Sequence, residues 1–169
     1  MKEEYKTIFI SGGLAGVLCI VFFLIFYWAG VPIFDSILKM DAWIPILAIF
    51  FSIYYYRNGI GESGLKFFQG IWMGLMVNLV VILLVTSCLY VLLEIIDPNY
   101  YKESVQALEL QIQQVIQSGK TLKVPVEDLI ATKEQMKTES SLSFIKGKGF
   151  NYALFGLPAT LVFSVLFRK

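Results

Sequence analysis

The chain has 169 residues, enough for one ordinary domain; 57% of them are hydrophobic and only 16% are charged. Soluble domains are about 45–50% apolar and about 25% charged, so this composition excludes an ordinary water-soluble protein and indicates a membrane protein. The net charge of +1 gives no field that would attract nucleic acid, and the absence of histidine removes the commonest general base and transition-metal ligand.

The first expected element is a long apolar helix near the N-terminus. Residues 7–34 carry no charged side chain, and about 20 apolar residues suffice to cross a hydrocarbon core roughly 30 Å thick. Gly12 and Gly16 lie one helical turn apart in this segment, and small residues at that spacing let two membrane helices approach closely. We predict a span over about residues 7–31, with both glycines at a helix contact.

The second apolar segment is shorter. Residues 42–56 carry no charge and are flanked by Asp41 and Arg57. A carboxylate just before the segment is a good helix N-cap, and the arginine is able to extend its charged end to the membrane surface. We predict a short span over about residues 41–57; the alternative is a re-entrant or half-buried segment.

Residues 59–64, GIGESG, match the letters of the dinucleotide-binding pattern G-x-G-x-x-G. That site needs a parallel strand, an amphipathic helix and an acidic residue about 20 positions further on. Here the next helix is apolar on every face from Phe67 to Leu93, and the next acidic residue is Glu94. We therefore predict a turn between two helices and no cofactor.

The third apolar segment is expected to cross the membrane over about residues 65–95. Gly70 and Gly74 again lie one turn apart, and Asn78 continues their face by another turn. An unbonded amide in the membrane is costly, so we expect Asn78 to form an interhelical hydrogen bond. Helix packing is the simpler role for Asn78 and Gln69; the alternative is a polar pathway along this helix.

A polar block, residues 97–148, precedes the last apolar segment. Asp97 followed by Pro98 is a typical helix start, and a second, weaker helix opens at Pro125, so we predict an extramembrane helical hairpin. The first of its helices carries a heptad-like apolar stripe, which consists of Tyr101, Val105, Leu108, Ile112 and Val115. We expect this stripe to bind a protein partner or a second copy of the chain; the alternative is packing on the second helix of the hairpin and on the bilayer surface.

The last apolar segment is predicted to span the membrane over about residues 149–167. Pro158 lies in its middle and is expected to kink the helix. Four spans place both termini on one side of the membrane. The basic residues near the termini favour the cytoplasmic side for both.

The sequence thus predicts an all-α integral membrane protein, a single domain of four transmembrane helices with a helical extramembrane hairpin between the third and fourth. It contains no arrangement of a nucleophile with a base and no metalloprotease signature, so we expect no enzyme, catalytic residue, cofactor or metal site. The expected role is a non-enzymatic assembly, accessory or envelope-organising factor in contact with the lipid bilayer. The alternative is a small transporter or channel subunit that uses the polar face of the third helix.

Residues 64–74, GLKFFQGIWMG, resemble a motif of a family of small four-span bacterial membrane proteins, catalogued as a domain of unknown function. Gly64, Phe67, Gln69 and Gly74 match the pattern of that family, and the spacing of the apolar segments is similar along the whole chain. The resemblance implies an integral protein of the inner (cytoplasmic) membrane of a Bacteroidetes-type bacterium. It implies no activity and no catalytic residue.

Overall fold

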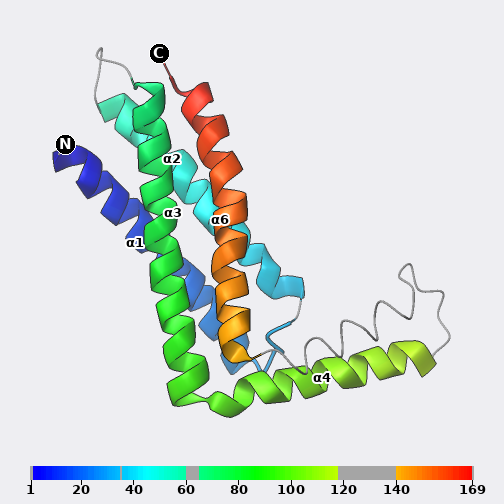
Figure 1. Cartoon of the computed structure of the whole chain (residues 1–169). Coiled ribbons are helices and arrows are strands. Elements are labelled where there is room, and N and C mark those ends of the chain that lie inside the picture. Colours follow the sequence, from blue (N-terminus) through cyan, green and yellow to red (C-terminus); the bar gives the residue numbers. More distant parts are fainter. Residues whose placement is uncertain (1, 35, 60–64, 118–139, 169) are drawn as a thin grey trace.

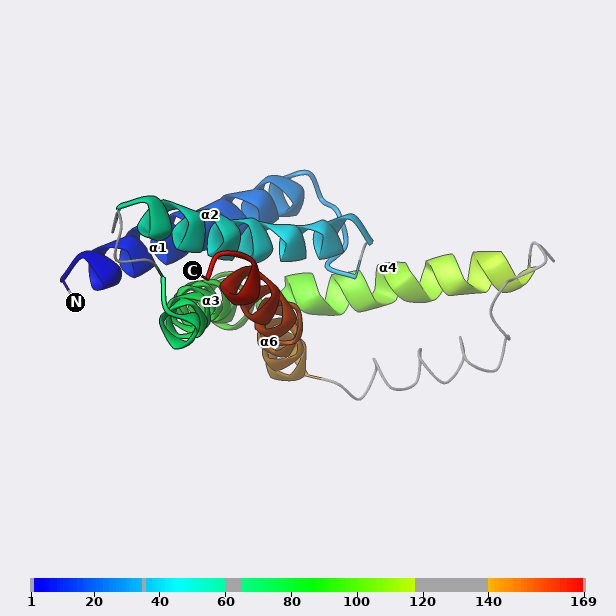
Figure 2. The ribbon, with the colours of Figure 1, turned by 90° about the horizontal axis from the view of Figure 1, so that it is seen from above.

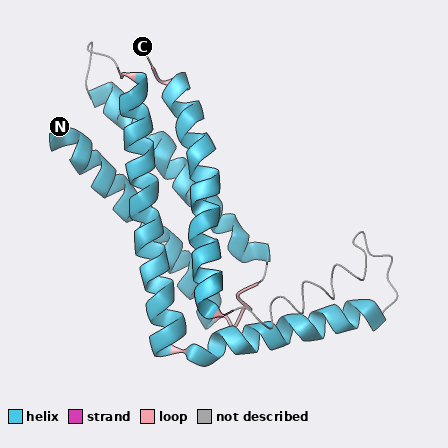
Figure 3. Cartoon of the chain, viewed as in Figure 1, coloured by secondary structure: helices cyan, strands magenta, loops and turns pink. Residues whose placement is uncertain are grey.

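The computed structural model describes residues 2–34, 36–59, 65–117 and 140–168. These residues form a bundle of long helices with one further helix set across its end (Figure 1). No strand occurs within the described ranges (Figure 3), in agreement with the predicted all-α class. Of the turn predicted at 59–64, Gly59 is the last residue of α2; the rest of the turn, with Gly64, and the predicted second helix of the hairpin lie outside these ranges and stay predictions.

The bundle is built from four helices that run alternately in opposite directions. They are α1 (Lys2–Trp28), α2 (Trp43–Gly59), α3 (Phe67–Tyr90) and α6 (Ser141–Leu166), with a short 3₁₀ helix, η1 (Ser36–Ala42), before α2. A π-helical segment, η3 (Val91–Ile96), extends α3, and α4 (Pro98–Gln117) follows it. Both termini therefore lie at one end of the bundle and α4 lies at the other (Figure 1).

Three helices are long and apolar enough to cross a membrane: Glu3–Trp28, Phe67–Ile96 and Ser141–Leu166. The bundle exposes large apolar side chains and buries polar ones such as Asn78 and Thr160. Exposed apolar side chains occur on all four bundle helices, for example Phe9, Phe51, Leu83 and Leu161. This distribution suits a hydrocarbon environment, where polar groups must be satisfied inside the protein.

Helix α2 has 17 residues, so at about 1.5 Å per residue it is roughly 25 Å long. It is nevertheless an integral part of the bundle, because it packs against α1, α3 and α6. Viewed from above (Figure 2), α1 and α2 lie side by side, α3 lies next to α6, and α4 extends outward from the bundle.

The last helix begins earlier than the predicted span at residue 149. Helix α6 starts at Ser141, where the Ser140 hydroxyl accepts a hydrogen bond from the Ser143 amide at 3.3 Å. The Ser141 hydroxyl donates to Glu94 of η3, which holds the start of α6 against the end of α3. The prediction placed the boundary after Lys148 because a lysine is costly in a membrane, and the structure shows how that charge is accommodated.

Candidate functional site

A buried ion pair joins two residues that the sequence analysis placed at membrane boundaries, Asp41 and Lys148. Lys148 Nζ lies 2.7 Å from Asp41 Oδ2 and 2.9 Å from Oδ1, and it donates to the Leu38 carbonyl at 2.9 Å. The Tyr152 hydroxyl donates to Asp41 Oδ2 at 2.7 Å. Because Asp41 is only 2% exposed, the ion pair and these hydrogen bonds must compensate for the lost hydration of its carboxylate. They fasten η1 to α6.

Sequence reasoning missed this cluster, since it assigned Asp41 to a helix cap and Lys148 to the extramembrane block. The sequence nevertheless contains a pattern that indicates the position of Lys148. Lys148, Tyr152, Gly156 and Thr160 follow one another at four-residue spacing, so they share one face of a helix. A lysine that heads a face of small and polar residues points into the bundle when that face is buried.

The interface between α3 and α6 continues the polar face beyond the ion pair. Asn78 Nδ2 donates to the Tyr152 carbonyl at 3.2 Å, which is an interhelical bond of the expected kind. Two oxygens in this interface, Asn78 Oδ1 and Thr160 Oγ1, are buried without a hydrogen-bond partner among the residues that the structure describes. The α3–α6 contact thus forms a polar seam, which we define as Lys148, Tyr152, Asn78, Thr160 and Ser164.

Glycines allow α3 and α6 to approach closely along this seam. A Cβ atom placed on Gly74 would lie 2.6 Å from Thr160 Oγ1, and one on Gly156 would lie 2.2 Å from Asn78 Nδ2. Gly70 faces Ser164 in the same way, with its Cβ position 2.9 Å from the hydroxyl oxygen. Real Cβ atoms do not come so close to their neighbours, so no larger residue fits without a shift.

The two glycines of the first helix contact α3 rather than a partner molecule. A Cβ on Gly12 would lie 2.9 Å from Cβ of Val80, and one on Gly16 would lie 2.7 Å from Cδ1 of Leu84. The predicted small-residue spacing is therefore used inside the bundle, at the contact between α1 and α3.

Gln69 and Asn78 do not form a single polar face. They are nine positions apart, which at about 100° per residue places them on opposite sides of α3. Gln69 Nε2 donates to the Tyr56 hydroxyl at 2.9 Å and to Glu4, so it joins α3 to α2 and α1 near the termini. Phe67 is half-buried at the start of α3.

Pro158 lies on the exposed side of α6, and the helix continues through it to Leu166. Its ring therefore points away from the α3–α6 seam. The carbonyl four residues earlier loses its helical donor.

Helix α4 is attached to the end of α1 by a set of short hydrogen bonds. Asp97 accepts from the Tyr27 hydroxyl at 2.9 Å and from the Tyr100 amide at 3.1 Å, so it also caps α4 as predicted. The Tyr100 hydroxyl donates to the Val31 carbonyl at 2.6 Å, and Ser104 Oγ accepts from the Ile33 amide at 3.1 Å. These bonds fix the direction in which α4 leaves the bundle.

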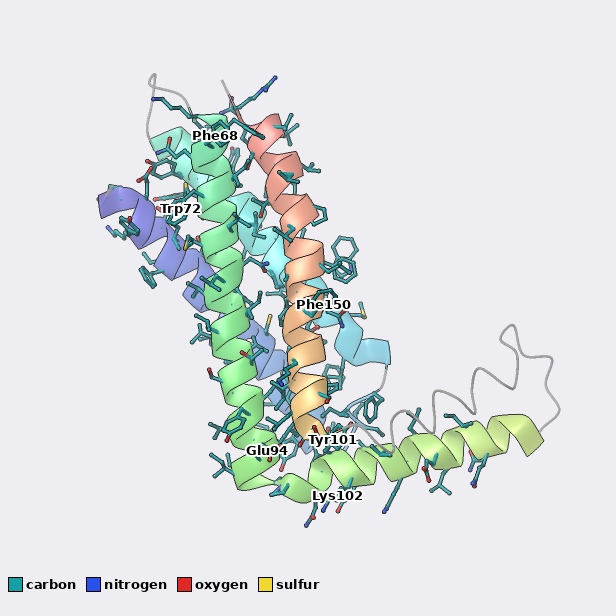
Figure 4. The ribbon with its side chains drawn as sticks, in the orientation of Figure 1. Phe68, Trp72, Glu94, Tyr101, Lys102 and Phe150 are labelled. Carbon is teal, nitrogen blue, oxygen red and sulfur yellow. The ribbon has the colours of Figure 1, made fainter. Side chains whose placement is uncertain are left out.

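Four members of the apolar stripe of α4 are buried or half-buried. Tyr101 and Ile112 are buried, and Val105 and Leu108 are half-buried; the side chain of Val115 lies outside the description. Tyr101 packs edge-on against the ring of Phe34, with the centroids 5.7 Å apart. Figure 4 shows Tyr101 on the bundle side of α4 and Lys102 on the opposite side.

We expect Tyr100→Phe to lower the free energy of unfolding by about 1 kcal/mol, because the bond to Val31 is lost while the ring contact with Tyr27 is kept. Burial raises the pKa of Tyr100 to about 12, and the nearby Tyr27 and Asp97 add to the rise. A tyrosine in the unfolded chain loses its proton near pH 10. The stability conferred by the protonated hydroxyl is therefore complete below about pH 10 and declines toward about pH 12.

Thermal unfolding of the wild type and Tyr100→Phe in detergent between pH 7 and pH 12 checks this expectation. The difference between the two proteins should shrink above about pH 10. A constant difference over the whole range would contradict it.

Comparison with known proteins gave one positive result. A family model described as Protein of unknown function (DUF4199) matches residues 11–169. No curated protein and no solved structure matches the chain.

Proposed function

The chain belongs to the DUF4199 family, and from this premise we propose that it is a four-span, non-enzymatic membrane protein that acts by contact with a protein partner. The observation that carries the proposal is α4, a helix anchored by its first residues to the end of α1 and extended away from the bundle. We propose that it works as an assembly, accessory or envelope-organising factor.

The proposed fourth span is α2. It packs against the other three bundle helices, and it exposes Leu47, Phe51 and Tyr55 on the outside of the bundle. A helix of roughly 25 Å is accommodated by modest thinning of the bilayer. Four spans are also in keeping with the position of both termini at one end (Figure 1).

We further propose the inner membrane of a bacterium as the location, with both termini in the cytoplasm. Lys6, Arg57, Lys66 and Arg168 lie at or near the helix ends on the side of the termini. At the opposite end the charge of Lys148 is neutralised by the ion pair with Asp41, so Lys148 is not counted as a free loop charge. Lys39, Lys102 and Lys146 remain close to helix ends on that side, against Lys2, Lys6, Arg57, Lys66, Arg168 and Lys169 on the side of the termini. A count of the basic residues closest to the spans therefore favours cytoplasmic termini.

The proposed contact surface is the exposed side of α4, because the described members of its apolar stripe are buried or half-buried. Lys102, Gln106 and Gln113 are exposed on this helix. A rigidly mounted helix loses little conformational freedom when a partner binds, which favours affinity. The same side also exposes Leu110. A mainly polar surface with one apolar residue suits a reversible contact with a partner rather than a permanent apolar interface.

Site-specific photo-crosslinking in cells tests the proposal. A photoreactive residue at exposed Gln106 should form a reproducible adduct with one protein, and the same residue at buried Ser104 should not. Loss of the adduct on adding a charge at the neighbouring Gln113 would identify α4 as the contact. If Gln106 and Ser104 give the same adducts, or neither gives any, α4 does not bind a partner.

A second candidate function, a small transporter or channel subunit, is favoured by the polar seam between α3 and α6. Ionisable side chains inside membrane bundles commonly mark ion or substrate pathways, and Asp41 and Lys148 form such a pair here. Solute flux in proteoliposomes that is abolished by Asn78→Leu, in a variant that still folds, would support transport. Absence of flux for ions and small solutes with the wild-type protein would count against it.

A further inference from the structure

A depression of about 520 Å³ lies where the end of α1 meets the start of α4. Its walls come from both helices and from the loop between α1 and η1. The residues that matter for its chemistry are Tyr27, Trp28, Asp97, Tyr100 and Glu103. The hydrogen bonds from Tyr27 to Asp97 and from Tyr100 to Val31 hold these walls in place, so the depression is preformed.

The lining of the depression is suited to a cation. Asp97 and Glu103 contribute two carboxylates, and none of the described residues that line it is a lysine or an arginine. Tyr27 and Tyr100 meet edge to face with centroids 4.7 Å apart, and the indole of Trp28 stands beside them. Aromatic faces together with carboxylates are the groups that recognise an ammonium ion in proteins.

An apolar stripe on the outside of α1 leads to this depression. Its members recur every three or four residues and are all exposed: Leu14, Leu18, Val21, Ile25 and Trp28. Such spacing places them on one face of the helix. Trp28 is 77% exposed and belongs to both the stripe and the depression, so the apolar surface and the acidic, aromatic surface are continuous.

The position along the bundle matches the level of lipid headgroups. α1 is one of the helices able to cross the membrane and its apolar segment ends at Trp28. Tryptophan is enriched where hydrocarbon meets headgroups. A ligand that fills the depression and also covers the stripe must carry a cation at one end and an acyl chain at the other.

We propose that the depression between α1 and α4 binds the ammonium headgroup of a membrane lipid, of the phosphatidylethanolamine class, whose acyl chain lies along the exposed stripe of α1. The ammonium is held between Glu103, Asp97 and the aromatic rings. The site is separate from the surface of α4 proposed to contact a protein, and it gives the corner between the two helices a lipid-dependent stability.

Native mass spectrometry of the full chain in detergent tests this site. The probe is an equimolar mixture of phosphatidylethanolamine and phosphatidylglycerol with identical acyl chains. We expect the wild type to retain the ethanolamine lipid over the glycerol lipid by about fivefold, the selectivity that one moderate cation contact supplies. Glu103→Gln should bring the ratio close to one, and Glu3→Gln, the same change at an exposed residue at the far end of α1, should leave the preference for the ethanolamine lipid in place.

Two further outcomes decide whether the ligand is a lipid. Ile25→Asn, which places an amide in the apolar stripe, should weaken retention of both lipids and leave the ratio between them unchanged. Free ethanolamine should fail to displace the lipid at equal concentration, since it lacks the acyl chain. Equal retention of both lipids by the wild type, or displacement by free ethanolamine, would overturn the proposal.

Discussion

Lys148→Met is expected to destabilise the protein by about 3–5 kcal/mol, because it leaves the Asp41 carboxylate buried without its countercharge. Asp41 is 2% exposed, and Tyr152 would be its remaining side-chain donor among the contacts described above. The bond from Lys148 to the Leu38 carbonyl is lost as well. Since these contacts fasten η1 to α6, the variant should also release the segment that enters α2.

The double variant Asp41→Asn, Lys148→Met separates the loss of charge balance from the loss of contacts. It removes both charges and keeps a side chain of similar size at each position, so much of the stability should return. Lys146→Met is the control, since Lys146 is exposed two positions away in α6 and surface changes usually cost less than about 0.5 kcal/mol. Thermal unfolding in detergent measures all three. Equal losses in Lys148→Met and Lys146→Met would show that the ion pair does not stabilise the fold.

Gly156→Ala is expected to cost about 1–3 kcal/mol through overpacking, even though alanine is the better helix former. The added Cβ would lie 2.2 Å from Asn78 Nδ2, so either the Asn78 side chain turns away or the helices separate. In the first case the hydrogen bond to the Tyr152 carbonyl is lost. In the second the glycine contacts along the whole α3–α6 seam loosen.

Gly147→Ala is the matched control for this substitution. It lies in the same helix, and a Cβ there meets nothing within 4 Å, so alanine should raise stability by up to about 1 kcal/mol. The double variant Gly156→Ala, Asn78→Ala removes the clash along with the amide, and its cost should be less than the sum of the two single variants. Additive costs would show that Gly156 and Asn78 do not meet as the structure places them.

Lys148→Met and Gly156→Ala both test how the helices associate without help from the hydrophobic effect. In lipid the apolar outer surfaces gain little by packing against one another, so close backbone approach and buried polar contacts must hold the bundle together. The glycine positions on α1, α3 and α6 supply the first, and Asp41, Lys148, Tyr152 and Asn78 supply the second. Loss of either is therefore expected to affect folding more than loss of an exposed apolar side chain.

The all-α class, the membrane-spanning length of three helices and the start of α4 at Asp97-Pro98 were predictable because each depends on neighbouring residues. Uncharged length sets whether a helix can cross a membrane, and a cap followed by proline sets where a helix begins. Local spacing also predicts that four glycines lie at helix contacts, namely Gly12, Gly16, Gly70 and Gly74. It does not predict which helix each of them contacts.

Three features were decided only by tertiary structure. Asp41 and Lys148 are 107 positions apart, and no local pattern states that two charges will neutralise each other across the bundle. Helical spacing alone places Gln69 and Asn78 on opposite sides of α3, but the order of helices around α3 decides that Gln69 meets α1 and α2 and Asn78 meets α6. Tyr101, the first member of the α4 stripe, packs against the rings of Phe34 and Phe144, contacts that no local pattern states. Sequence fixes what each helix needs to bury, whereas the arrangement of the other helices determines which neighbour buries it.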